Sequence, residues 1–270
     1  MYFSPHIEVR YPFPRSRRAK SLAFTLIELL TVIGIIGILA AILIPVLGSV
    51  RETARATEDA GRLRASFSAL NVFSADNRGR MKRASQWVSP ATGAWQSDSS
   101  GGGVFMTWTN WLAGKDSSAS GAMLKGLTTY ITDYKTFISP SVLPDAYLPT
   151  NGSIYRTFGM FNGGAVAGYN SADWLQNGDH ILSLVPVPGR LPLLADTVTN
   201  DQGGATITGL GFYYFYTGNL RENSGIHLRY SNQANVVFYD GHMARLGRQQ
   251  LADLGFTQAV GKDLKTVSLP

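Results

Sequence analysis

The chain has no cysteine among its 270 residues. Disulfide bonds and thiolate metal sites are therefore excluded, and any folded domain must be held together by its own core. The HExxH, GxSxG, P-loop and dinucleotide-binding patterns are also missing from the sequence. We therefore expect a protein that is not an enzyme.

Residues 24–47, FTLIELLTVIGIIGILAAILIPVL, contain no lysine or arginine. Glu28 is the one ionisable side chain in this run. A helix of that length covers about 36 Å, enough to cross the hydrocarbon core of a bilayer. A carboxylate deep in such a span costs about 2 to 3 kcal/mol, so Glu28 should have a partner. The run is too long for an ordinary secretory signal, and an uncut signal anchor would leave Glu28 unexplained.

Residues 1–23 form a basic leader in front of this run. The leader has a single acid, Glu8, and five basic residues: Arg10, Arg15, Arg17, Arg18 and Lys20. It therefore supplies four of the six net positive charges of the chain. Positive charge before a span keeps that end in the cytoplasm and sends the rest across the membrane. The basic balance thus indicates topology, and we expect no nucleic-acid partner.

A cut between Ala23 and Phe24 would supply a partner for Glu28. The new α-amine would lie about one helical turn from the carboxylate, and a neighbouring subunit's amine could be drawn to the same group. The basic leader, the Phe-Thr-Leu-Ile-Glu run and the long apolar segment together resemble the N-terminal motif of type IV prepilins and type II secretion pseudopilins.

That resemblance implies both processing and assembly. A prepilin peptidase would cleave before Phe24 and methylate the new amine, and Glu28, the fifth mature residue, would guide subunits into a filament. Pro45 falls where many relatives carry a helix-bending proline, whereas Ala23 replaces the glycine that the family prefers before the cut. The implied partners are identical or related pilin subunits, the prepilin peptidase, an inner-membrane assembly platform and membrane lipid.

Residues 48–79 predict an amphipathic continuation of the helix. One largely apolar face has spacings of three and four and is formed by Ala56, Ala60, Leu63, Phe67, Leu70 and Ser74. The charged residues assigned to other faces are Arg51, Glu52, Arg55, Glu58, Asp59, Arg62 and Arg64. We expect the apolar face to pack on a domain, and the helix to end near Asn77 with Gly79 as a left-handed cap.

Residues 80–270 are expected to form one extracytoplasmic globular domain. All five tryptophans lie between Trp87 and Trp174. Exposed aromatics near Asn and Asp could bind a sugar, but large aromatics dominate ordinary cores, so the core interpretation is favoured. The words SADNRGR at 74–80 and SIYRTFGMFNG at 153–163 resemble segments of pilin-like proteins of the planctomycete and verrucomicrobial kind.

Two short runs near the C-terminus, 235–239 and 242–246, predict strands on either side of Asp240-Gly241. An Asp-Gly pair suits the positive φ angles of a type I′ turn, so we expect a hairpin here. The segment resembles a pilin-associated motif written as His, nine residues, Asp-Gly. In this chain Tyr230 stands at the position of that histidine.

Asp196, Asp201 and Asp240 offer oxygen ligands of the kind that calcium prefers. Major pseudopilins in related systems bind calcium in a C-terminal loop, so the resemblance makes calcium the one candidate cofactor. His227 and His242, with Asp196 and Asp240, could also be drawn as a metal or hydrolytic cluster. Backbone geometry alone explains the Asp-Gly turn, so no catalytic residue is assigned.

The sequence thus predicts an α+β, pilin-like protein. One long N-terminal helix, first transmembrane and then amphipathic, would pack on an antiparallel sheet with a loop-rich C-terminal region. The expected function is that of a structural subunit in a type II secretion pseudopilus or a type IV pilus-like filament. It would cross the cytoplasmic membrane once, with the domain in the periplasm or on a surface filament. The alternatives are a signal-anchored domain that binds a ligand such as a glycan without polymerising, and an anchored hydrolase.

Overall fold

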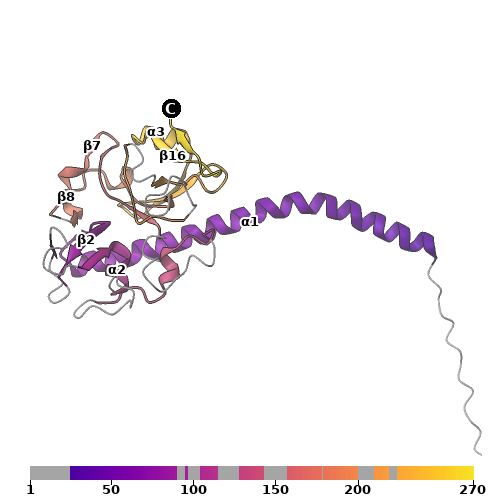
Figure 1. The fold of residues 1–270 in the computed structure, drawn as a ribbon, viewed down its shortest axis with the longest axis horizontal. Helices are drawn as coiled ribbons and strands as arrows, with labels where there is room; N and C mark the ends of the chain where they lie inside the picture. The colour runs from indigo at the N-terminus through magenta and orange to yellow at the C-terminus, as the bar shows by residue number, and fades with distance from the viewer. Residues whose placement is uncertain are drawn as a thin grey trace, which may run out of the picture. The chain divides into compact units, whose positions relative to one another are not determined.

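The structure is a computed structural model that describes residues 25–89, 95–96, 104–114, 128–142, 157–177, 179–199, 210–218 and 224–270. The chain divides into two compact units, Met1–Gly48 and Ser49–Pro270. The helix α1 (Leu26–Asp76) contributes to both units (Figure 1). The leader predicted at residues 1–23 lies outside the described residues.

In the first unit, α1 presents apolar side chains on all sides. Every residue from Thr25 to Gly48 is exposed except Ala40, which is partly buried. The helix contains an unburied window of mean hydropathy 2.8, so it is long and apolar enough to cross a membrane. A bilayer requires that backbone groups bond within the segment, and a continuous helix meets that requirement. Pro45 lies inside the helix without ending it, although it has no N–H to donate.

In the second unit, residues 49–76 of α1, here called the stem, bury one face. The buried stem residues are Ala56, Asp59, Leu63, Ser66, Phe67, Ala69, Leu70, Phe73 and Ser74. The predicted apolar face is therefore confirmed, apart from Ala60, which is only partly buried. The assignment of Asp59 to a solvent face was wrong, because its side chain is fully buried. Asp59 follows Ala56 by three residues and precedes Leu63 by four, so helix geometry turns it inward despite its charge.

The stem ends as the sequence predicts, with one addition. Gly79 has a φ of 75° and Arg78 one of 58°, so two residues rather than one take the left-handed conformation. The Gly79 N–H donates to the Ser74 carbonyl at 2.8 Å, which is the long bond of a Schellman cap. The chain then turns into β1.

Three basic side chains after the stem, Arg80, Lys82 and Arg83, have partners within the second unit. Asp179 accepts from Lys82 at 3.0 Å and lies 3.7 Å from Arg80. The Arg83 guanidinium donates to Asn162 at 2.9 Å. These contacts tie the end of the stem to the strands that follow it.

The largest sheet has five strands in the order β12-β5-β10-β14-β15. Their bounds are β12 (Tyr214–Phe215), β5 (Gly159–Phe161), β10 (Pro192–Ala195), β14 (Ala234–Phe238) and β15 (Met243–Leu246). All neighbours are antiparallel except β12 and β5, which run parallel. All five residues of β14 are buried, so this strand is covered on both faces.

Shorter strands complete the second unit. Two three-stranded sheets are formed by β1 (Arg80–Lys82), β9 (Asp179–Ile181) and β8 (Leu175–Gln176), and by β3 (Trp95–Gln96), β2 (Ser85–Val88) and β4 (Val104–Thr107). The two-stranded pairs are β11 (Thr197–Val198) with β13 (Gly225–Ile226), β16 (Gln258–Val260) with β17 (Thr266–Ser268), and β6 (Ala165–Val166) with β7 (Tyr169–Asn170).

Short helices connect these strands. They are α2 (Trp108–Ala113), α3 (Arg248–Asp253) and the 3₁₀ turns η1 (Tyr134–Phe137), η4 (Ser171–Asp173), η5 (Leu182–Leu184) and η6 (Pro188–Arg190). Within the second unit, α3 and β16 lie away from the stem (Figure 1). The α+β class and the pilin-like arrangement of a long apolar helix with mainly antiparallel strands are confirmed.

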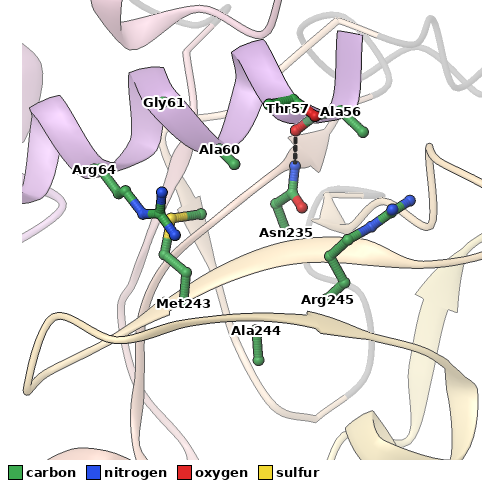
Figure 2. A pocket seen from close by; sticks show the side chains of 9 residues that line it. All are labelled: Ala56, Thr57, Ala60, Gly61, Arg64, Asn235, Met243, Ala244 and Arg245. Atoms are coloured by element: carbon green, nitrogen blue, oxygen red, sulfur yellow. Dashed lines mark hydrogen bonds between the residues drawn. The ribbon is translucent and has the colours of Figure 1, made fainter. Parts of the chain in front are cut away.

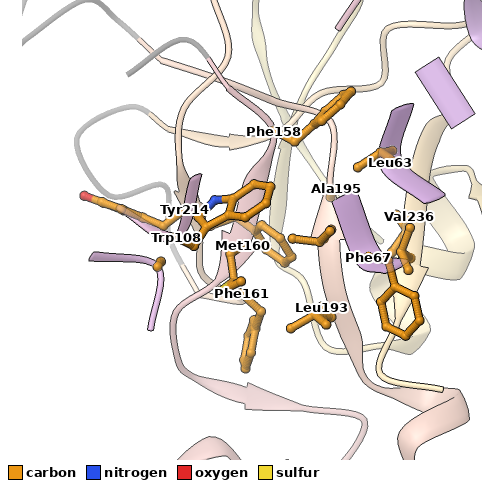
Figure 3. Packing of buried hydrophobic residues seen from close by; sticks show 14 of the residues in the cluster. Leu63, Phe67, Trp108, Phe158, Met160, Phe161, Leu193, Ala195, Tyr214 and Val236 are labelled. Carbon is orange, nitrogen blue, oxygen red and sulfur yellow. The ribbon is translucent and has the colours of Figure 1, made fainter. Parts of the chain in front are cut away.

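Part of the core packs the stem against the five-stranded sheet (Figure 3). Leu63 and Phe67 of the stem pack in the same cluster as Val236 of β14. Trp108 and Trp174 are fully buried in this cluster, and Trp111 is 5 % exposed. The core interpretation is confirmed for these three tryptophans, because buried indoles have no face to offer a sugar.

The predicted hairpin exists, but its turn is not of type I′. The Gly241 N–H donates to the Phe238 carbonyl at 2.9 Å, and Gly241 has a φ of 88°. Asp240 does not have a positive φ, so one left-handed glycine follows an ordinary turn, as in three-residue hairpins with a glycine bulge. The loop Ala167-Gly168 between β6 and β7 instead has positive φ at both residues, as a type I′ turn requires.

Candidate functional site

The start of α1 is held by Thr25 and Glu28. The Thr25 backbone N–H and hydroxyl donate to Glu28 Oε2 at 2.8 and 2.7 Å, and the Glu28 N–H donates to the Thr25 hydroxyl at 3.2 Å. This is a capping box, in which the first and fourth residues satisfy each other's free groups. The carboxylate also suits the positive end of the helix dipole.

The sequence already contained this partner for Glu28. The spacing Thr25-x-x-Glu28 is the capping-box pattern, and it lies at the start of the apolar run. The partner expected from the sequence was a positive charge, whereas the partner in the structure is the neutral Thr25. The box occupies one carboxylate oxygen, Oε2, and Phe24, whose amine we expect to reach Glu28, lies outside the described residues together with Ala23.

The segment from Ile226 to Leu246 makes buried polar contacts with the stem. Asn235 of β14 donates from its side-chain amide to Asp59 Oδ2 at 2.8 Å and to the Ala56 carbonyl at 3.0 Å. The Tyr230 hydroxyl donates to Asp59 Oδ1 at 3.2 Å. A buried carboxyl with no partner would be costly, so these two residues allow Asp59 to occupy the interface.

A buried ion pair lies beside Asp59. Arg229 donates through Nε and Nη2 to the two oxygens of Asp196 at 2.7 and 3.2 Å. Two-point contacts of this kind fix a guanidinium against a carboxylate. Burial raises the pKa of Asp196, whereas Arg229 lowers it. For Asp59, burial followed by the nearby charge of Asp196 raises the pKa to about 7.

The Asp-Gly turn packs directly on the stem. A methyl group on Gly241 would collide with the ring of Phe67. Gly241 is therefore needed both for its positive φ and for this close approach. The turn that resembles the pilin-associated motif thus serves, in this chain, to seat the hairpin against the stem.

The same C-terminal segment contacts the stem nearer Ser49. The Glu52 carboxylate accepts from the Ser231 N–H and from Lys262 Nζ at 2.5 and 2.7 Å. The Lys262 hydrogen bond, and then the Ser231 backbone, lower the pKa of Glu52. The C-terminal region therefore contacts the stem at three positions along its length: Glu52, Asp59 and Phe67.

The residues considered for a calcium site or a hydrolytic site have different partners in the structure. Asp196 is paired with Arg229, whereas Asp240 accepts from the His242 N–H at 3.0 Å and lies 2.6 Å from that ring's Nδ1. Partial burial alone would raise the pKa of Asp240, but the hydrogen bonds from His242 outweigh it, and the pKa is lowered. Asp201 lies outside the described residues. Within the described part of the chain, no group of three such side chains is placed to hold a metal ion, and calcium stays a prediction.

The buried histidines are also no acid-base pair. Burial lowers the pKa of His227 and of His180 to about 3, so both rings are neutral near pH 7. The His180 ring contacts the Tyr239 hydroxyl at 2.5 Å, and Trp174 donates its indole N–H to the same hydroxyl at 3.0 Å. This network links β9, the residue after η4 and the hairpin turn.

Two open grooves follow the stem. One, of about 430 Å³, runs between the stem and β15. Figure 2 shows it, with Arg64 at one end and Arg245 at the other, over Ala60 and Asn235. The second, of about 390 Å³, is lined by Val72 and other stem residues on one side. On the other side it is lined by Tyr130 and Ile131, which precede η1, and by Thr136 within it. Both leave part of the stem surface accessible.

One protein-family model matches part of the chain. The family described as the prokaryotic N-terminal methylation motif matches residues 18–44, which contain Ala23, Phe24 and Glu28. The chain carries a prepilin-type motif. The match supports a type IV pilin-like precursor that prepilin peptidase processes, and it indicates a structural protein rather than an enzyme. No curated protein and no solved structure matches the chain.

Proposed function

We propose that the chain is a structural subunit of a pilus-like filament, either a type II secretion pseudopilus or a type IV pilus-like fibre. The observation that carries the proposal is the prepilin-type motif at residues 18–44, at the head of a helix that is apolar on every side. Sixteen of the exposed large hydrophobics, from Leu26 to Val50, lie on this helix. Outside a bilayer such a surface needs to be covered by other protein.

In this proposal the first unit anchors the precursor in the cytoplasmic membrane, with its basic leader on the cytoplasmic side. Prepilin peptidase removes the leader before Phe24 and methylates the amine. The capping box keeps Glu28 at the tip of the helix, where its second oxygen can accept the amine of a neighbouring subunit. The charge pair sets the register between subunits while apolar helices pack together.

Substitution of Glu28 tests this role. We expect Glu28→Ala to leave cleavage and membrane insertion intact and to lower filament yield by about tenfold or more, because a charge-assisted contact between subunits is lost. Filaments sheared from cells with their own assembly machinery are measured by immunoblot and electron microscopy. Glu58→Ala is the matched control, since Glu58 is an exposed carboxylate on the same helix, paired within the chain to Arg62. Normal filaments from Glu28→Ala would overturn the role.

A further inference from the structure

Within the described residues, Asp59 is the one buried ionisable side chain of the stem. Asn235 and Tyr230, which donate to its two oxygens, are both neutral, as is the nearby Ser139 hydroxyl. A second buried carboxylate, Asp196, lies close enough to interact with it electrostatically. Arg229 interacts electrostatically with both carboxylates and places Nε and Nη2 on Asp196. Two carboxylates therefore face one guanidinium, whose two-point contact is made with Asp196.

We propose that Asp59, Asp196 and Arg229 form a proton-dependent latch between the stem and the five-stranded sheet. Asp59 holds a proton when the stem is seated. Its ionisation places a second negative charge beside Asp196 and loosens the contact. The latch belongs to the second unit alone and does not depend on filament formation.

The burial of Asp59 on neutral partners supports its protonated form. The Tyr230 hydroxyl lies near three oxygens, those of Asp59 at 3.2 Å, Ser139 at 3.1 Å and Ser141 at 3.0 Å. A tyrosine hydroxyl has one proton to donate, so at most one of these oxygens receives it. Each serine hydroxyl can donate to the tyrosine oxygen, so the tyrosine proton is free for Asp59. The hydrogen bonds that Asp59 receives from Tyr230 and Asn235 thus come from neutral groups, and a fully buried carboxyl with such partners favours the protonated form.

The charges that face Asp59 come from other elements. Asp196 stands between β10 and β11, and Arg229 and Tyr230 follow β13. Burial, and then Asp196, raise the pKa of Asp59 to about 7, with Ser139, Asn235 and Arg229 opposing the rise. Burial raises the pKa of Tyr230 as well, so it stays neutral, and Arg229 stays charged.

The direction of the pH effect follows from the raised pKa. In the unfolded chain Asp59 titrates near its ordinary value of 3.8. Between that pH and about 7, the folded protein binds a proton that the unfolded chain does not. The contribution of Asp59 to stability is thus complete below about pH 4 and is lost as the pH rises through 7.

The buried histidines act in the opposite direction and must be separated from the latch. His180 and His227 are neutral in the folded protein and charged in the unfolded chain below about pH 6.5, so they add stability as the pH rises. The useful quantity is therefore the difference between the wild type and Asp59→Asn, because the histidine contribution cancels in it.

The test is thermal unfolding of the full chain in detergent micelles, followed by tryptophan fluorescence from pH 5 to pH 8. Asparagine mimics a neutral carboxyl, so Asp59→Asn and the wild type should differ least at pH 5, the acid end of this range. We expect the variant's advantage to grow by about 5 to 10 °C by pH 8, as the wild-type Asp59 ionises. Glu58→Gln, an exposed carboxyl one residue away, should track the wild type throughout. A difference between wild type and Asp59→Asn that does not change with pH would overturn the latch.

A second measurement needs no stable variant. Infrared spectroscopy of the folded wild type should show the carbonyl stretch of a buried protonated carboxylic acid at pH 5.5, and this band should fade as the pH approaches 8. Its presence with that titration supports the latch, and a wild type without the band at pH 5.5 overturns it. If Asp59→Asn folds, loss of the band assigns it to Asp59.

Discussion

The contact between Gly241 and Phe67 gives the sharpest stability prediction. Gly241→Ala introduces one methyl group at a residue with a φ of 88°, against the ring of Phe67. A left-handed backbone costs an L-residue about 1 to 2 kcal/mol, and overpacking a filled site costs about 1 to 3 kcal/mol. We therefore expect a loss of about 2 to 5 kcal/mol, with a fall in melting temperature of roughly 5 to 20 °C.

Gly168→Ala separates the two causes. Gly168 also has a left-handed φ, 86°, but a methyl group there meets nothing within 4 Å. This control should show the conformational cost alone, about 1 to 2 kcal/mol. The difference between Gly241→Ala and Gly168→Ala then measures the clash with Phe67.

A double-mutant cycle completes the experiment. Phe67→Leu removes the ring that the new methyl group would strike, so Gly241→Ala in that background should cost no more than Gly168→Ala. All variants are measured as full chains in detergent by chemical and thermal unfolding with tryptophan fluorescence. Equal losses for Gly241→Ala and Gly168→Ala, with no coupling to Phe67, would refute the claim that the Asp-Gly turn is seated on the stem.

Two further substitutions test the polar contacts of the second unit. Tyr239→Phe should cost about 1 to 3 kcal/mol, because the buried Trp174 indole and His180 ring lose a shared partner, and unchanged unfolding would contradict this. Glu52→Gln should cost less than about 1 kcal/mol, because the pair with Lys262 is half exposed. Since the pKa of Glu52 is lowered, its contribution should be present above pH 4.5 and disappear as the pH falls, whereas an effect that persists in acid would indicate another cause.

The long helix was predictable from the sequence because its signals are local. An apolar run of this length, followed by apolar residues at spacings of three and four, admits few other structures. The Schellman end at Gly79 and the core position of Trp108 follow from equally local or strongly apolar signals.

Asp59 shows where local reasoning fails. Its spacing from Ala56 and Leu63 placed it on the buried face, but its charge outweighed that spacing in the sequence argument. The residues that permit its burial, Tyr230 and Asn235, lie more than 170 positions away in the chain. A buried carboxyl of this kind is determined by tertiary contacts that a single sequence does not display.

The predictions of the hairpin turn type and of the partner of Glu28 were wrong for different reasons. The dipeptide Asp240-Gly241 suited two kinds of hairpin, and the stem decided between them through the contact of Phe67 with Gly241. The capping box of Thr25 and Glu28, in contrast, is a local pattern that is visible in the sequence. A cation was expected as the partner of Glu28 instead. Strand β1 pairs with β9, which follows much later in the chain, so this pairing could not be predicted from the sequence alone.

The mature N-terminus tests the central claim most directly. It is read by mass spectrometry of the protein purified from its own cell envelope. The account predicts a chain that begins at Phe24 with a methylated amine, as the motif at residues 18–44 indicates. A chain that retains its leader would contradict processing before Phe24, assign the failure to Ala23, and leave an anchored domain that does not polymerise.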